Sequence, residues 1–262
     1  MSLGFGFGLQ YSRLSGGGSG NTDAFIIEVK TDNAGTSNDN QFQFTGAVGD
    51  YDVVAKQNGT QVATFNDLSG EQTITLPSSG IYVLEVIPKE VNGFNRIEFN
   101  DGGDKLKITD IKQWGTIVWS NFNRSFFGCS NMLVTAIDIP DLSQCEDLYA
   151  MFTLCNLANP LVKDWNVSTI NSMTVMFNGA TLANPDCRNW DVSNVINMSA
   201  MFLNSNLSTE NLTAIYENWS QLNLEQNVSF DAENIKYNSS GQAGRDILIN
   251  TYNWIIEDGG QV

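Results

Sequence analysis

The chain has 262 residues, enough for one or two domains with their own hydrophobic cores. Its 29 acidic and 13 basic residues give a formal charge of −16, which argues against a nucleic-acid partner because such partners select a basic face. The sequence contains no histidine, so Ser-His-Asp and Cys-His catalysis are excluded. It has no apolar run of about 18 residues, so we expect no membrane insertion.

Residues 1–21 are rich in glycine and serine and are expected to form an N-terminal anchor and linker. Four apolar residues alternate there with small or polar ones, namely Phe5, Phe7, Leu9 and Tyr11. In an extended strand they would project from one face, and the glycines between them would let another backbone approach. A disordered tail fits the composition too, but the alternation favours a docking peptide that binds a partner or forms a homo-oligomer such as a trimer. The start has no basic leader and is not expected to be a signal peptide.

Residues 22–104 are predicted to form a β-sandwich, because short β-rich runs alternate there with turn signals such as Asn58-Gly59. The expected strands are 25–29, 41–44, 51–56, 62–65, 72–76, 81–87 and 96–99. Seven short strands are typical of a small Ig-like domain. The stretches 31–40 and 80–86 resemble an Ig-like or PKD-like module, although the WGDG turn of that module is absent.

Two loops in this region, 32–40 and 100–104, are rich in Asp and Asn. Their oxygen atoms are ligands of the kind that calcium takes. Their spacing matches no EF-hand loop, and ordinary turn chemistry explains the same residues. We therefore assign no metal site and no cofactor, and keep calcium as an alternative for these loops.

A 25-residue period then dominates residues 105–207. Several columns of equivalent residues recur at this interval: Phe127, Phe152, Phe177 and Phe202; Met132, Leu157, Leu182 and Leu207; Met151, Met176 and Met201; Leu148, Met173 and Met198; and Trp165 and Trp190. Such a period predicts stacked units that share one continuous core. Within a unit, residues 189–192 are expected to form a short strand that pairs in parallel with the next unit, and residues 192–202 a helical or 3₁₀ turn. The expected fold is a short right-handed, leucine-rich-repeat-like solenoid.

The stretches 165–177 (WNVSTINSMTVMF) and 190–202 (WDVSNVINMSAMF) resemble the repeat of the BspA-like bacterial surface-protein family, which is related to leucine-rich repeats. The resemblance covers about 105–207, and its first unit fits only with a slip of one residue, because Cys129 lies three residues after Phe126 and Cys155 three after Phe152. The family occurs on bacterial surfaces and in bacteriophage virion proteins. The resemblance therefore implies adhesion, and it brings no catalytic residues.

Residues 208–262 are predicted to cap the end of the stack. Ser208 or Thr209 is expected to start a helix. Its apolar face would consist of Leu212, Ile215, Tyr216, Trp219 and Leu222. A strand at 228–230, a second helix from Ser240 and a strand at 254–256 should follow. This tail resembles the one that closes proteins with the same repeat.

The four cysteines, Cys129, Cys145, Cys155 and Cys187, are expected to be buried free thiols, because three of them occupy otherwise apolar columns. A disulfide between Cys129 and Cys155 on neighbouring units is the alternative. No Cys or His cluster is spaced for a metal, so no metal site is expected.

These observations predict a non-enzymatic bacteriophage virion protein, a head or tail fibre or a decoration, that displays the solenoid for attachment to a host surface. The resemblance to a surface family together with the missing export signal favours the virion over the alternative, a bacterial cell-surface adhesin. A glycan-cleaving phage spike using a carboxylate pair is a further alternative. Host glycan or protein would be bound by exposed polar residues on equivalent sites of adjacent units, namely Lys163, Asp164, Arg188 and Asn189. The N-terminus would bind the other virion proteins.

Overall fold

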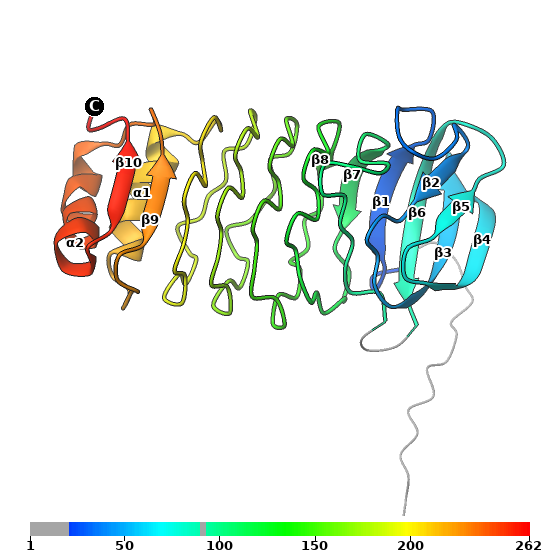
Figure 1. Cartoon of the computed structure of the whole chain (residues 1–262), viewed down its shortest axis with the longest axis horizontal. Helices are drawn as coiled ribbons and strands as arrows, with labels where there is room; N and C mark the ends of the chain where they lie inside the picture. Colours follow the sequence, from blue (N-terminus) through cyan, green and yellow to red (C-terminus); the bar gives the residue numbers. More distant parts are fainter. Residues whose placement is uncertain (1–20, 90–92) are drawn as a thin grey trace, which may run out of the picture.

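The computed structural model describes residues 21–89 and 93–262. Within them the fold is mixed and β-dominated, with open sheets, two α-helices and no closed barrel. The molecule is elongated: a sheet lies at one end, coils of chain are stacked along the middle, and both helices lie at the other end (Figure 1).

The sheet at the N-terminal end has six strands in the order β4-β3-β6-β1-β7-β8. The strands are β1 (Phe25–Lys30), β3 (Asp50–Gln57), β4 (Thr60–Ser69), β6 (Ile81–Pro88), β7 (Ile108–Gln113) and β8 (Leu133–Val134). A separate two-stranded sheet pairs β2 (Gln41–Gln43) with β5 (Thr73–Thr75). Six of the seven expected strands are thereby confirmed. The strand expected at 96–99 is wrong, because this backbone bonds to loops: Glu98 donates to the Thr45 carbonyl and Phe99 to the Ser125 carbonyl, both at 2.9 Å.

Aromatic side chains fill the space beside these sheets. Tyr51 contacts Phe94 edge to face with ring centres 5.0 Å apart, and Phe25 contacts Trp119 at 5.1 Å. The sheet does not end where the repeats begin, because β7 pairs antiparallel with β1 and parallel with β8. The strand direction thus changes at β7 from antiparallel to parallel, the only direction in which successive coils of one hand can pair. One hydrophobic core runs from Phe25 to Trp254.

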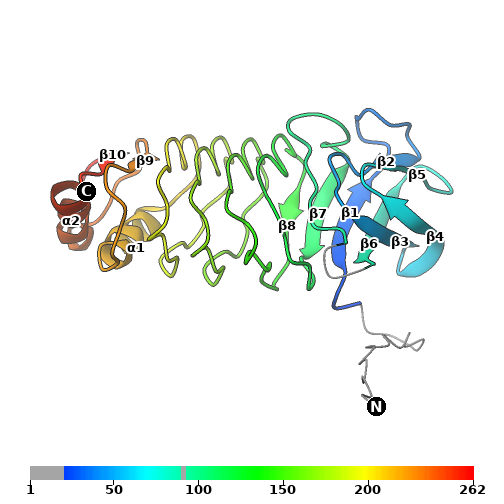
Figure 2. The same cartoon turned by 60° about the horizontal axis from the view of Figure 1, so that its bottom comes forward.

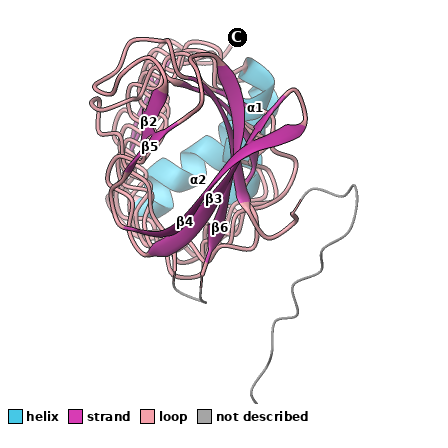
Figure 3. Cartoon of the chain, turned by 90° about the vertical axis from the view of Figure 1, so that its right-hand side faces the viewer, coloured by secondary structure: helices cyan, strands magenta, loops and turns pink. Residues whose placement is uncertain are grey.

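The coils are held together by backbone hydrogen bonds between residues about one repeat apart. Leu148 donates to the Ser172 carbonyl, Phe152 to Met176 and Phe177 to Met201, each at 2.9 Å. Parallel bridges join Asp147 to Ser172 and Ser172 to Asn197. The repeated coils are visible from the side in Figure 2 and along the long axis in Figure 3, where their loops follow similar paths.

The position of this pairing corrects two expectations. Residues 189–192 form no strand, because the pairing lies farther along the coil, near Asn197. Residues 192–202 form no continuous helix, but single turns with the i→i+3 hydrogen bond of the 3₁₀ type are present as expected, because Val195 donates to the Val192 carbonyl at 3.0 Å and Met201 to the Met198 carbonyl at 3.2 Å. Within the second turn Ala200 has a left-handed φ of 52°, as do Ala150 (54°) and Val175 (51°) at equivalent sites. A left-handed residue stops a right-handed helix. The N–H groups of Ala150 and Val175 themselves donate to the next coil, at Thr174 and Ser199, while the N–H that follows each of them closes a turn within its own coil. The three-residue apolar spacing reflects successive turns instead.

The phenylalanine column is present, with one member corrected. Phe152, Phe177 and Phe202 stack with ring centres 5.6 and 5.8 Å apart, and Phe126 rather than Phe127 extends the column at 5.8 Å. The first coil is therefore out of step by one residue, as the two cysteines predicted. The expected Met132–Leu207 column is wrong in the middle, because Leu157 and Leu182 are 40% and 51% exposed. Ala158 and Ala183, one residue later, are buried instead.

Polar side chains close the turns of each coil. The carboxylate or amide oxygens of Asp141, Asn166 and Asp191 accept hydrogen bonds from the backbone N–H two residues later, at 2.9–3.2 Å. This Asx turn replaces a backbone bond that the bend cannot supply. The Trp190 indole adds a cross-coil bond, because its N–H donates to the Val162 carbonyl at 2.7 Å.

The C-terminal segment continues the same pairing. Met198 donates to the Ser229 carbonyl at 2.9 Å, which places β9 (Ser229–Ala232) where the next coil would lie. β10 (Ile255–Asp258) then pairs in parallel with β9. Helix α1 (Thr209–Trp219) and helix α2 (Gln242–Tyr252), preceded by a 3₁₀ turn (Ser239–Gly241), complete this end. The Ser208 hydroxyl accepts from the Asn211 N–H at 3.2 Å, so the predicted helix start is confirmed.

Removing one ring from the column should destabilise the whole stack. Phe177 is fully buried between two stacked rings, so Phe177→Ala leaves a cavity and should lower the free energy of unfolding by about 3–5 kcal/mol. Leu182→Ala, at a site 51% exposed, is the matched control and should cost less than about 1 kcal/mol. Denaturant unfolding measures both. An unchanged midpoint for Phe177→Ala would contradict a shared core.

Candidate functional site

The four residues predicted to bind a ligand lie on one corner of two adjacent coils. The Asn189 amide donates to the Asp164 carboxylate at 3.1 Å, so the structure brings these two together from neighbouring coils. Arg188 instead turns to its own coil, where its Nε donates to Asp186 at 2.7 Å. Lys163 is exposed. This corner offers polar groups to a ligand, but Asn189 and Asp164 already bond to each other and Arg188 already bonds to Asp186.

The predicted anchor residues, Phe5, Phe7, Leu9 and Tyr11, lie outside the described residues.

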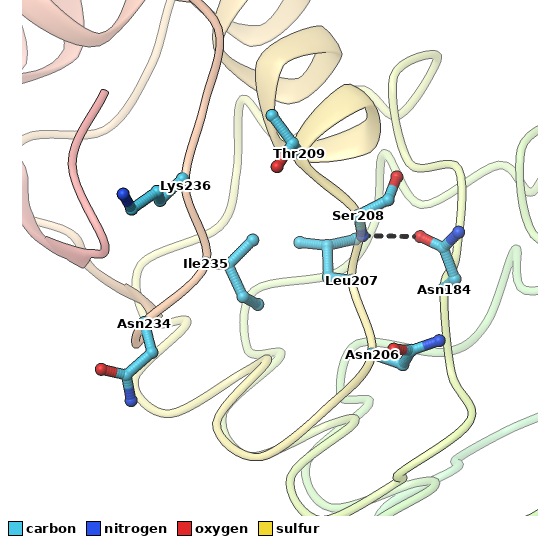
Figure 4. A pocket seen from close by; sticks show the side chains of 8 residues that line it. All are labelled: Asn184, Asn206, Leu207, Ser208, Thr209, Asn234, Ile235 and Lys236. Carbon is cyan, nitrogen blue, oxygen red and sulfur yellow. Dashed lines mark hydrogen bonds between the residues drawn. The ribbon is translucent and has the colours of Figure 1, made fainter. Parts of the chain in front are cut away.

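A shallow groove of about 460 Å³ lies instead where the last coil meets the C-terminal segment (Figure 4). It is lined by Asn184, Asn206, Leu207, Ser208, Thr209, Asn234, Ile235 and Lys236. Asn184 comes from a coil, 206–209 lead into α1, and 234–236 follow β9. The side chains of Leu207 and Ile235 face each other across the groove, and the remaining lining residues are polar. Six of the eight lining residues are polar, so the groove offers hydrogen-bonding groups more than apolar surface.

The loops considered for calcium meet around a buried lysine. The Lys107 ammonium donates to the carbonyls of Ser37, Asn38 and Gln41 at 2.9–3.1 Å. Asp104, fully buried beside it, accepts from the N–H groups of Ser37 and Gln43 at 3.0 and 2.7 Å. The carbonyl oxygens that a calcium ion would need are thus bonded to the protein's own cation. Among the described residues, no group of three or more Asp, Glu, Cys or His side chains is placed to hold a metal.

All four cysteines are free and buried, as predicted, and no disulfide joins Cys129 to Cys155. Burial raises the pKa of the Cys145 thiol to about 11 and raises the pKa of Cys129, Cys155 and Cys187 as well. The thiols are therefore protonated at neutral pH and fill space as small apolar groups.

A second buried polar cluster fastens the C-terminal elements to one another. The Asp258 carboxylate accepts from the Tyr216 hydroxyl at 2.6 Å and from the Arg245 Nε at 2.7 Å. Burial, reinforced by the bond to Asp258, raises the pKa of Tyr216. Because the three residues belong to α1, α2 and β10, the role of this cluster is structural: it joins these three elements.

The two helices of the described residues are too short and too polar to span a membrane.

Comparisons with known proteins add one match. Residues 120–240 match a family model described as a Mycoplasma protein of unknown function, DUF285. This range covers most of the coils and extends through β9. No curated protein and no solved structure matches the chain.

The groove residues were not predicted from the sequence. Asn234 and Lys236 lie after the 25-residue period ends, so no column marked them. Asn206 and Leu207 lie at its last positions, where the Leu207 column predicted burial rather than a site. The one available signal was Asn184, which repeats Asn159 one coil earlier: the Asn159 side-chain oxygen accepts from the Asn184 N–H at 2.9 Å, and the Asn184 oxygen accepts from the Ser208 N–H at 2.8 Å.

Replacing the buried lysine tests the loop network. Lys107→Met leaves Asp104 as an unpaired buried charge and should lower the free energy of unfolding by about 3–5 kcal/mol. Lys30→Met is the control, because the Lys30–Asp32 pair is about 40% exposed and should contribute less than about 1 kcal/mol. Added calcium or a chelator should leave the melting temperature of the native chain unchanged; a rise with calcium would refute this account of the loops.

Thiol accessibility tests the buried cysteines. Iodoacetamide at pH 8 should label none of the four in the folded protein, because their raised pKa values keep them protonated and burial excludes the reagent. Mass spectrometry after unfolding in guanidinium should find all four labelled. Rapid labelling of any one in the native state would show that its coil is open.

Proposed function

We propose that this is a non-enzymatic virion structural protein, a fibre or decoration of a bacteriophage, whose coils form a leucine-rich-repeat-like solenoid of the BspA-like type that attaches to a host surface. The observation that carries the proposal is the stack itself. It has a continuous core and an outer surface of turns rich in Asn and Ser, an architecture that presents an extended binding face.

In this proposal the N-terminal sheets, which include β1 to β6, form an Ig-like or PKD-like module. Such a module acts as a spacer between the anchor and the solenoid. The apolar alternation of Phe5, Phe7, Leu9 and Tyr11 supports docking of the N-terminus on other virion proteins or in a homo-oligomer. A bacterial cell-surface adhesin is the second candidate, since the repeat resembles surface proteins as well as virion proteins.

The groove favours binding over cleavage of a glycan. Retaining and inverting glycosidases need two carboxyl groups on either side of the bond they cut. The eight residues that line the groove include no Asp or Glu. The absence of histidine removes the common general base as well. Incubation with polysaccharide from the host should therefore release no reducing sugar.

Deletion of residues 1–15 tests the anchor. Among the described residues the first buried apolar side chain is Ala24, so we expect the truncated chain to keep the melting temperature and circular dichroism spectrum of the full chain. It should nevertheless fail to enter particles when it replaces the full chain during assembly. Mass spectrometry of purified particles measures incorporation, with Leu182→Ala in the full chain as an assembly-competent control. Normal incorporation of the truncated chain would overturn the anchor, and detection of the full chain only in cell envelopes would favour the adhesin.

A further inference from the structure

The groove exists because the stack is interrupted on one side of the molecule. On the Phe202 side, pairing continues into β9, where Phe202 donates to the Asp231 carbonyl at 3.1 Å. On the opposite side the chain leaves the stack at Ser208 to begin α1. The next backbone there, 234–237, bonds away from the coils, since Gly259 donates to the Ile235 carbonyl at 2.8 Å and Tyr237 to Gly260 at 3.1 Å. One turn of the stack is therefore missing, and the groove occupies its place (Figure 4).

Backbone N–H groups along both walls of the groove already donate hydrogen bonds within the protein. Asn206 donates to the Ala183 carbonyl at 3.0 Å, Ser208 to the Asn184 side chain at 2.8 Å, and Ile235 to the Ala232 carbonyl at 3.0 Å. An extended peptide that added itself as a strand would find few N–H groups to pair with. Recognition must then come from side chains, which favours a small ligand over a peptide strand.

The side chains offer an apolar contact bordered by groups that both donate and accept. Ile235 supplies the accessible apolar part, because Leu207 is only 5% exposed and belongs to the core. The hydroxyl of Thr209 and the amides of Asn206 and Asn234 make no hydrogen bond to another side chain within the described residues. The Asn184 amide is held in place, because its oxygen accepts from the Ser208 N–H at 2.8 Å and the Asn211 amide at 2.9 Å. Its nitrogen points away from Leu207 and Ile235 (Figure 4), so Asn184 fixes the positions of Ser208 and Asn211.

We propose that this groove binds a sugar ring of the host surface. A pyranose has an apolar C–H face that suits Ile235, and its hydroxyls both donate and accept, as amides and hydroxyls do. The groove volume of about 460 Å³ lies within the range of small-ligand sites. Lys236 is the one charged residue in the lining and adds a hydrogen-bond donor. Although the chain has a net charge of −16, no Asp or Glu lines the groove. The inference names the ligand class of the attachment proposed above and rests on that proposal.

The test is binding of the full chain to an array of bacterial polysaccharides, followed by titration with the monosaccharide of the best binder. The double variant Asn206→Ala/Asn234→Gly removes two amides at exposed sites. Glycine suits residue 234 because its φ is 64°, so the backbone is not strained. Asn189→Ala removes an exposed amide of the other predicted strip and tests that rival site. Asn156→Ala removes an exposed amide from an earlier coil, outside both sites, and is the matched control. Melting temperatures establish that all three variants are folded.

The expected result is sugar binding that the groove variant weakens about tenfold or more and that the control Asn156→Ala leaves unchanged. Binding that Asn189→Ala abolishes and the groove variant does not would overturn the groove while leaving attachment standing. Absence of any sugar binding, combined with adsorption of the fluorescent chain to host cells, would overturn the sugar and favour a protein receptor. Absence of both would overturn the proposed function itself.

Discussion

The backbone hydrogen bonds between coils are the interaction on which the rest of the structure depends. A coil here contains no helix and no hairpin, so many of its N–H and C=O groups have no partner inside the coil. Buried backbone groups must be paired, and the neighbouring coil supplies that pairing every second residue, as at Leu148, Ala150 and Phe152. No coil is therefore a stable unit alone, and the phenylalanine column adds apolar contact along the same direction.

This dependence sets what the two ends must do. A ladder of parallel pairs leaves an open edge wherever it stops, and open edges promote aggregation. At the first coil, β7 solves the problem by joining the ladder to an antiparallel sheet through β1. At the last, β9 and β10 prolong the pairing while α1 and α2 pack beside it, held by Asp258. The groove is a by-product of this ending, because the helical segment replaces only part of a coil.

The same dependence explains where the polar residues go. Many Asp and Asn side chains accept backbone hydrogen bonds within turns, as Asp191 does from Ser193. Their abundance is therefore partly a requirement of the repeat and does not by itself mark a ligand site. The loop at 32–40 is a second example. Its many oxygen atoms suggested a metal site, but its carbonyl oxygens accept hydrogen bonds from the Lys107 ammonium group.

The sequence by itself determined the period, most members of the core columns, most strands of the first sheet and the start of α1. These depend on side-chain type at fixed spacing, which burial selects directly. Only the tertiary structure decided which backbone segment of each coil pairs, since Ala200 and Val175 adopt left-handed conformations that their residue types do not favour. It also decided that 206–209 and 234–236 form a groove. The second of these segments lies outside the repeat, so only packing against the last coil brings the two together.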